Sequence, residues 1–325
     1  MRLVYTIMRS GSQAFRGAIG SVESPAKSDR RLLRISIKVN CNETYSYHRS
    51  YRQCRTPVIS QLIPTNVRIR ALARNPSTAN LPDQVEIISG DLTIPETLDR
   101  SLADVDTVFM VWTAPATAVE AALERIAKHV QRTVFLSSPH QTEHPFFRQP
   151  NPMATMHADI ERLIQASGMQ WTILRPGMFA SNALFWWAPQ IRKSDIVRWP
   201  YAEAATAPIH ELDIAVSAAR VLCAEGHNGK DYVLTGPQSL SQSEQVRIIG
   251  EVIGRSIRLE EITPDEARRE LLNIMPLPVI NMLMKAWEAA LGLPAYVATG
   301  VADITGSQAL AFRDWAVDHS AEFKR

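Results

Sequence analysis

The sequence has few cysteines and no long apolar run. Its three cysteines, Cys41, Cys54 and Cys223, show no metal-ligand or Cys-x-x-Cys spacing, so we expect neither structural disulfides nor a metal site. No apolar run reaches the ~18–20 residues that a membrane-spanning helix needs. The net charge of +2 gives no electrostatic reason to expect nucleic acid as a partner. These shortages favour a reduced, cytoplasmic protein that binds neither membrane nor nucleic acid.

The charge that is present is unevenly distributed. Residues 1–55 contain eleven Lys or Arg and only three Asp or Glu, whereas the rest of the chain has an excess of acidic residues. Two of the three cysteines also lie in this first stretch. A change in composition this abrupt indicates a boundary near residue 55.

From residue 66 onward, apolar strands alternate with helical segments. Residues 107–112 (TVFMVW) and 133–137 (TVFLS) are nearly continuous apolar runs, as expected for parallel strands buried on both faces. Between them, residues 116–129 repeat apolar side chains at helical spacing. Strands joined by crossover helices predict an α/β fold with a doubly wound parallel sheet.

Several short motifs resemble those of one family, in the same order along the chain. They are residues 67–76 (VRIRALARNP), 90–92 (GDL), 174–179 (LRPGMF) followed by Asn182, 213–215 (DIA), 234–237 (LTGP) and the tail 305–315. Together they resemble the NmrA-like family, a group of atypical short-chain dehydrogenases with a Rossmann-type NAD(P)-binding fold. The resemblance covers about 270 residues.

This resemblance implies a domain organisation and a class of activity. Residues 56–180 would form the dinucleotide-binding core, and residues 181–325 a smaller C-terminal α/β substrate subdomain interleaved with the last strands. The implied activity is NAD(P)H-dependent reduction of a small apolar acceptor, such as a quinone, an azo compound or an enone. The alternative is a non-catalytic redox-sensing regulator that binds the dinucleotide and a protein partner. A homodimer is compatible with either.

Residues at the ends of the predicted strands are the candidates for cofactor binding. Arg74 follows the second strand, where it could pair with a 2′-phosphate, which favours NADP(H) over NAD(H); the alternative is a solvated turn arginine. Asp91 would lie near the adenine edge or, equally, cap the next helical turn. The remaining candidates, from strand ends and family motifs, are Leu92, Val111, Trp112, Thr113, Ser137, Ser138, His157, Pro176 and Phe179.

The catalytic pair of classical short-chain dehydrogenases is missing. In those classical enzymes a Tyr-x-x-x-Lys pair lies on the helix after the fifth strand, and in their extended relatives a Glu commonly follows the Lys by four residues, whereas many NmrA-like reductases work without such a Tyr. Here Glu161 places His157 at the Lys position and Met153 at the Tyr position. Methionine cannot donate a proton, so His157 is the candidate catalytic residue, with a surface position as its alternative. His140 and His144 are further candidates in the preceding loop.

An aromatic-rich stretch follows the sixth strand and predicts the substrate pocket. Phe179, Phe185, Trp186 and Trp187 are its candidate lining residues, with Trp199 further along. In the resembling family this region lines the pocket, and a flat apolar acceptor would fit there. Core packing or a dimer contact would account for the same side chains.

The main departure from the family is the absence of a glycine-rich phosphate loop. A fold of this type begins with a buried strand and G-x-x-G-x-x-G, whose glycines let backbone amides approach the pyrophosphate. Residues 45–55 (YSYHRSYRQCR) contain no glycine. The nearby segment 32–39 (LLRISIKV) alternates apolar and polar residues, so we expect a half-exposed strand rather than a central one, and the first strand and its loop to be missing.

A shift of reading frame would account for the missing loop. When residues 42–55 are back-translated and read one nucleotide later, a consistent choice of codons gives MKLILITGATGNVG. This is an initiator methionine, a buried strand and a complete glycine-rich loop. We therefore interpret residues 1–55 as an anomalous N-terminal extension, out of frame or disordered. The competing interpretation of residues 1–43 is a basic, acid-poor mitochondrial presequence.

The coding DNA tests this interpretation directly. We expect its +1 frame across codons 42–55 to encode the glycine-rich loop, and a frame without glycines there would refute the idea. We also expect the chain as written to bind NADPH more weakly than micromolar, because arginine and tyrosine side chains keep the backbone away from a pyrophosphate. Isothermal titration calorimetry with NADPH would measure the difference in dissociation constant between this chain and one that carries the alternative-frame segment.

Overall fold

The computed structural model describes residues 34–38, 57–273 and 275–325, with only the backbone described for 34–38. The predicted extension over 1–55 and the missing phosphate loop lie outside these ranges, apart from the strand at 34–38. No helix in the described ranges is long and apolar enough to cross a bilayer.

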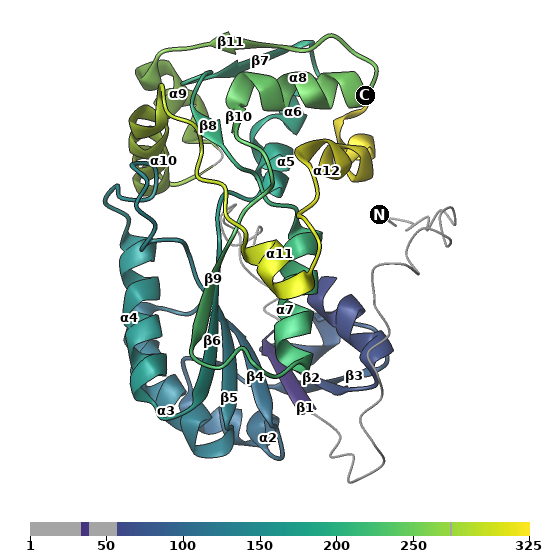
Figure 1. Cartoon of the computed structure of the whole chain (residues 1–325), viewed down its shortest axis with the longest axis vertical. Coiled ribbons are helices and arrows are strands. Elements are labelled where there is room, and N and C mark those ends of the chain that lie inside the picture. The colour runs from purple at the N-terminus through teal and green to yellow at the C-terminus, as the bar shows by residue number, and fades with distance from the viewer. Residues whose placement is uncertain (1–33, 39–56, 274) are drawn as a thin grey trace. The chain divides into compact units, whose positions relative to one another are not determined.

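Seven parallel strands form the central sheet, in the order β3-β2-β1-β4-β5-β6-β9 (Figure 1). They are β1 (Arg34–Lys38), β2 (Arg68–Ala73), β3 (Val85–Ser89), β4 (Thr107–Val111), β5 (Arg132–Leu136), β6 (Gln170–Pro176) and β9 (Lys230–Leu234). The strand order reverses between β1 and β4, as in doubly wound dinucleotide-binding folds. The predicted fold class is confirmed.

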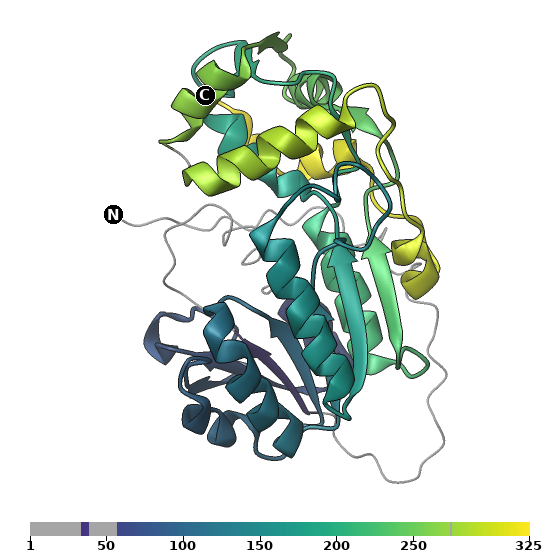
Figure 2. The same cartoon turned by 90° about the vertical axis from the view of Figure 1, so that its left-hand side faces the viewer.

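Helices cover both faces of the sheet. The short helix α2 (Asp99–Leu102), α3 (Val119–His129) and α4 (Pro152–Ala166) lie on one face, and the helix at 57–62, α7 (Glu211–Cys223) and α11 (Gly300–Thr305) lie on the other (Figures 1 and 2). Each strand residue joins one of the two cores according to the two-residue period of a strand.

Strand β4 shows this alternation clearly. Val108 and Met110 pack in the core that includes α3 and α4, whereas Phe109 and Val111 pack in the core that includes α7. Both faces are therefore buried, which explains why the sequence of this strand is a continuous apolar run.

The place of β1 corrects a prediction. We expected the segment 32–39 to be half-exposed and not central, and the first strand to be missing. Instead the backbone of Arg34–Lys38 pairs with β2 on one side and with β4 on the other. Main-chain hydrogen bonding does not require an apolar side-chain pattern, and the gap between β2 and β4 leaves two rows of backbone groups that need partners.

A smaller α/β subdomain is built from the second half of the chain. It contains α5 (Ala183–Trp186), α6 (Ala188–Ile191), β7 (Ile196–Trp199), α8 (Gln242–Val252), β11 (Arg258–Glu261), α9 (Pro264–Leu271), α10 (Leu277–Ala290) and α12 (Phe312–Asp318). Strands β8 (Ala205–Thr206) and β10 (Leu240–Ser241) pair beside them. Its own core holds four fully buried tryptophans, Trp187, Trp199, Trp287 and Trp315. Because α7 and β9 return to the large sheet between these elements, the two parts interleave.

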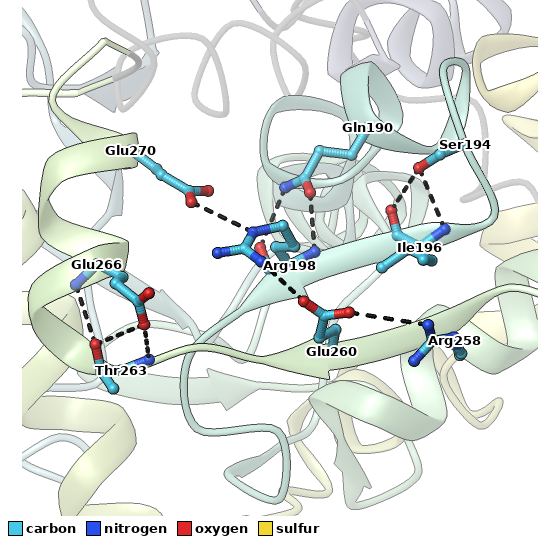
Figure 3. Close-up of polar contacts among 9 residues, drawn as sticks. All are labelled: Gln190, Ser194, Ile196, Arg198, Arg258, Glu260, Thr263, Glu266 and Glu270. Atoms are coloured by element: carbon cyan, nitrogen blue, oxygen red, sulfur yellow. Dashed lines mark hydrogen bonds and ion pairs between the residues drawn. The ribbon is translucent and has the colours of Figure 1, made fainter.

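Charged and polar contacts join β7 and β11, which pair in parallel (Figure 3). Arg198 on β7 contacts Glu260 on β11 at 2.8 Å and Glu270 on α9 at 3.4 Å. The Gln190 side chain accepts a hydrogen bond from the Arg198 backbone N–H at 2.9 Å. These half-exposed pairs fix strand register more than they add stability, because exposed ion pairs contribute little.

The residues on either side of α12 are fastened to the N-terminal end of α7 by buried carboxylates. Asp213 accepts a hydrogen bond from the Leu310 backbone N–H at 2.9 Å, and Glu211 contacts His319 at 2.5 Å. Burial raises the pKa of Asp213 to about 6, although the Leu310 N–H acts in the opposite direction. At neutral pH the Asp213 carboxyl is still mostly ionised, and burial makes this ionisation cost free energy in the folded chain relative to the unfolded chain.

Replacement of this carboxylate predicts a change in the dependence of stability on pH. Since the folded pKa of Asp213 is raised, its contribution to stability is complete below its unfolded pKa of 3.8 and is lost as the pH rises through about 6. We expect Asp213→Asn, which keeps an acceptor for Leu310, to raise the free energy of unfolding at pH 8 by about 1–3 kcal/mol. Urea denaturation of wild type and variant at pH 4.5 and pH 8 measures this difference in the free energy of unfolding.

The matched control is Glu124→Gln, which removes one exposed carboxylate from α3. This variant should follow the wild-type pH dependence within about 0.5 kcal/mol. An Asp213→Asn variant with the same loss of stability between pH 4.5 and pH 8 as wild type would contradict the assignment.

Candidate active site

The carboxyl ends of the parallel strands meet along one edge of the sheet, where ligands bind in open α/β folds. Most of the residues predicted to bind the cofactor follow these strand ends. They are Arg74 after β2, Asp91 and Leu92 after β3, Val111 to Thr113 at β4, Ser137 and Ser138 after β5, and Pro176 at the end of β6. The structure therefore brings together residues spread over about 100 positions of the sequence.

The residues after β2 and β3 differ in what they present at this edge. Arg74 is exposed and follows β2, at the strand end where the adenosine ribose lies in folds of this type. Asp91 is engaged in its own turn, because its Oδ1 accepts hydrogen bonds from the backbone N–H of Thr93 at 2.9 Å and from its hydroxyl at 3.0 Å. Leu92 is buried in the core beside α3. Of the three, only Arg74 presents a cation.

The residues after β4 and β5 are mostly buried. The exposed fractions of Val111, Trp112 and Thr113 are 1%, 3% and 9%, so their side chains pack inside the protein at this edge. Ser137 is fully buried and donates a hydrogen bond to Glu161. Ser138 lies on a cavity wall, and its Oγ is buried without a hydrogen-bond partner among the described residues.

A buried ion pair holds β5, β6 and α4 together below this edge. The Arg175 guanidinium on β6 donates to both carboxylate oxygens of Glu161 on α4, at 2.7 and 3.1 Å. Arg175 also contacts Asp231 on β9 at 2.8 Å. The side chains of Glu161 and Arg175 are only 2% and 4% exposed. The Glu that marks the family helix therefore acts here as a structural anchor.

His157, the predicted catalytic residue, lies on the buried side of the same helix, α4. Its side chain is 1% exposed and its ring meets the edge of Phe135, with 5.7 Å between ring centroids. Burial, together with the nearby His140, lowers its pKa to about 4. The ring is therefore neutral at pH 7, and it does not line the cavity described below. A surface position, the alternative considered for this residue, is wrong, and its catalytic role stays a prediction.

The cavity lies between the sheet edge and the smaller subdomain, with a volume of about 140 Å³. Its wall comes from the loop before α4, the segment after β6, and α10. It is lined by Ser138, Pro139, His140, Phe146, Phe147, Gln149, Asn151, Ala154, Pro176, Gly177, Met178, Phe179, Asn182, Phe185, Trp186, Met275, Val279, Met282, Leu283 and Ala286. The lining is mainly aromatic and apolar, as in small-molecule sites.

Three of the four aromatic residues predicted for the pocket lie on this wall. Phe179, Phe185 and Trp186 line it, whereas Trp187 is 1% exposed and packs against Trp186 and Trp199 inside the subdomain. Neighbouring residues on a helical turn face different directions, so a run of aromatics divides between a cavity and a core.

Sequence reasoning missed most of the opposite wall. Met275, Val279, Met282, Leu283 and Ala286 come from α10 and its N-terminal approach, and their pattern predicted only a helix that packs on its own protein. Phe146 and Phe147 lie in a loop without periodic pattern. The one available signal was their spacing at i, i+3, i+4 and i+7 along α10, which does not distinguish a core face from a pocket face.

The described part of the edge fits a dinucleotide at both ends. Exposed Arg74 after β2 suits the adenosine side, and the unpartnered Ser138 hydroxyl after β5 suits the nicotinamide side. The two strands lie on opposite sides of the β1–β4 reversal, where such cofactors cross the sheet. Residues 39–56, where a fold of this type would carry its pyrophosphate loop, lie outside the described ranges. Among the described residues, no group of three His, Cys, Asp or Glu side chains could hold a metal ion.

Comparison with known proteins agrees with this geometry. The model of the NAD(P)H-binding family matches residues 56–184. The (4-alkanoyl-5-oxo-2,5-dihydrofuran-3-yl)methyl phosphate reductase of Streptomyces griseus is 32% identical over 265 residues, which cover 78% of this chain and 90% of that protein. The NAD(P)H azoreductase of Xenophilus azovorans is 31% identical over 275 residues, covering 82% and 94%.

A solved structure shows the same fold. The triphenylmethane reductase of Citrobacter sp., complexed with NADP(H), aligns with a TM-score of 0.72 at 19% identity, over 89% of this chain and all of that one. The matched family model, the two relatives and the sheet order lead to one assignment. The chain belongs to the NAD(P)H-binding, NmrA-like family of Rossmann-type oxidoreductases.

Proposed function

We propose that this protein is an NADP(H)-preferring reductase of a planar, uncharged, apolar acceptor such as an azo compound, a quinone or an enone. The observation that carries the proposal is the cavity at the carboxyl ends of β5 and β6. It adjoins Ser138 and Pro176, which follow the strands on the nicotinamide side of the edge. An acceptor in this cavity would lie beside the reactive end of the cofactor.

The wall chemistry supports an apolar acceptor. Five aromatic residues and the methionines Met178, Met275 and Met282 line the cavity, and no Lys, Arg, Asp or Glu of the described chain is among its lining residues. Aromatic faces stack on planar molecules, and methionine adapts to varied shapes. A phosphate ester, the substrate class named for the Streptomyces griseus relative, would find no lysine or arginine of the described residues on this wall.

The chain's own residues position the acceptor and keep water away from it. The nicotinamide, when bound, supplies the hydride, so the protein needs to hold the acceptor and exclude solvent. Trp186 and Phe179 are buried at 8% and 7% exposure on the wall, and the α10 side chains close the opposite side. The Arg175–Glu161 pair fixes β6 against α4, and with them the two segments that carry Pro176 and Ala154.

An acceptor panel tests the proposal. NADPH oxidation is followed at 340 nm with a neutral azobenzene, a naphthoquinone, an enone and a phosphate-bearing enone, using this chain and the chain with the alternative-frame segment in place of residues 42–55. We expect turnover of the neutral acceptors and at least about tenfold lower kcat/KM for the phosphate ester. Tight NADPH binding without turnover would instead favour the dinucleotide-binding regulator.

Arg74 should determine the preference between the two cofactors. We expect Arg74→Ala to weaken NADPH binding by about 10- to 100-fold, because a charge-assisted pair with the 2′-phosphate is lost, and to change NADH binding less than threefold. Dissociation constants from the quenching of protein fluorescence measure both.

The matched control for this variant is Arg68→Ala, which removes the same charge from the other end of β2. It should leave both dissociation constants within about twofold. Equal losses for NADPH and NADH in Arg74→Ala would show that Arg74 does not contact the 2′-phosphate.

A further inference from the structure

We propose that His140 donates the proton that completes reduction of the acceptor, with Glu161 as a positioning residue behind it. The inference rests on the proposed reductase function and names the residue that replaces the absent tyrosine of the classical enzymes. It is carried by the composition of the cavity wall and by the contacts of the His140 ring.

Reduction of the proposed acceptors needs a proton as well as a hydride. In an azo compound, hydride forms one N–H bond, the N=N π bond breaks, and its electron pair collects on the second nitrogen. A proton from the His140 imidazolium forms the second N–H bond. NADPH is thereby oxidised to NADP+, the azo group is reduced to a hydrazo group, and His140 regains a proton from water.

His140 is the only described residue on the cavity wall suited to this task. The other polar lining residues are Ser138, Gln149, Asn151 and Asn182, whose side chains do not exchange a proton near neutral pH. Histidine is the side chain that ordinarily does so. Its side chain is 10% exposed, and no other described lining residue is an ionisable acid or base.

The residues expected from the family pattern are unsuited to it. Met153 occupies the tyrosine position but has no proton to give, and it does not line the cavity. His157 has a pKa of about 4 and packs against Phe135, away from the wall. His144 lies in the same loop as His140, but its Nε2 contacts the Pro294 carbonyl at 3.0 Å and it does not line this cavity.

Two contacts orient the His140 ring. Its Nδ1 donates to the Ser138 carbonyl at 3.0 Å, so the ring is tethered to the residue that follows β5. Its Nε2 lies 3.7 Å from Glu161 Oε2 and has no hydrogen-bond partner among the described residues. That separation exceeds a hydrogen bond, so Nε2 is buried near the carboxylate without being bonded to it. For Nε2 to reach an acceptor in the cavity, the ring must turn about its Cβ–Cγ bond, which releases Nδ1 from the Ser138 carbonyl.

Glu161 is placed to hold the ring in this position. Its two oxygens already accept hydrogen bonds from Arg175 and Ser137, so the carboxylate is fixed in place. It therefore offers His140 a stationary negative charge on the side away from the cavity, without competing for the proton, because Arg175 balances it.

The test compares two acceptors that differ in their need for a proton. A neutral azobenzene needs hydride and a proton, whereas a triphenylmethane dye is a cation that hydride alone converts to a neutral product. We expect His140→Gln to lower kcat for the azobenzene by about 100-fold or more, and to leave dye reduction within twofold, at millimolar NADPH. The wild-type azobenzene rate should fall at alkaline pH, because the reaction needs the protonated donor, and the variant should lose this dependence.

Binding and a matched variant separate catalysis from structure. Quenching of tryptophan fluorescence by the azobenzene, measured without NADPH, should give the same dissociation constant for wild type and His140→Gln within twofold. His144→Gln, in the same loop, should reduce both acceptors at wild-type rates.

Three outcomes would overturn the proposal. Equal losses of kcat for azobenzene and dye in His140→Gln would show that His140 is a structural residue. An unchanged azobenzene rate would show that His140 does not donate the proton. A wild-type chain that oxidises NADPH with neither acceptor would overturn the proposed function, and the role of His140 with it; that result is seen before any variant is made.

Discussion

The candidate site depends on one buried carboxylate. Glu161 on α4 is bound on both oxygens by Arg175 of β6 and also accepts from Ser137 of β5, so one charge joins two strands and a helix at the edge where they end. Removal of one partner from such a pair costs about 3–5 kcal/mol, because the other charge stays buried alone. These contacts also position residues of the cavity wall. Ser138 follows Ser137, Pro176 follows Arg175, and Ala154 lies on the same helix as Glu161.

The cavity exists because two parts with separate cores meet at this edge. The large sheet supplies polar groups and the ends of strands, while the smaller subdomain supplies aromatic residues and the apolar side of α10. Neither part alone would enclose an acceptor. The interleaving of the chain, with α7 and β9 returning to the sheet, connects the two parts at several points and limits their separation.

The sequence was sufficient for the fold and for half of the site. Strands β4 and β5 are buried on both faces, so their apolar runs identified them, and the family motifs located Pro176 and Phe179, which line the cavity. It was not sufficient for α10, because helical periodicity is the same whether a face meets a core or a cavity. It also could not show that His157 faces inward beside Phe135 while His140, in an irregular loop, faces the cavity; loop conformation depends on contacts such as His140 with Ser138 that leave no periodic trace. The alternating sequence of β1 led to a wrong prediction of its position in the sheet. A side-chain pattern indicates burial, whereas the position of β1 between β2 and β4 is set by main-chain hydrogen bonds.

The central position of β1 has a consequence for any shortened form of this protein. A chain that began after residue 38 would leave β2 and β4 each with a row of unsatisfied N–H and C=O groups facing a gap. Exposed strand edges of this kind recruit strands from other molecules and promote aggregation. Insolubility of such a fragment would therefore reflect the loss of a single five-residue strand, and an added segment able to pair in parallel with both neighbours would be the appropriate remedy.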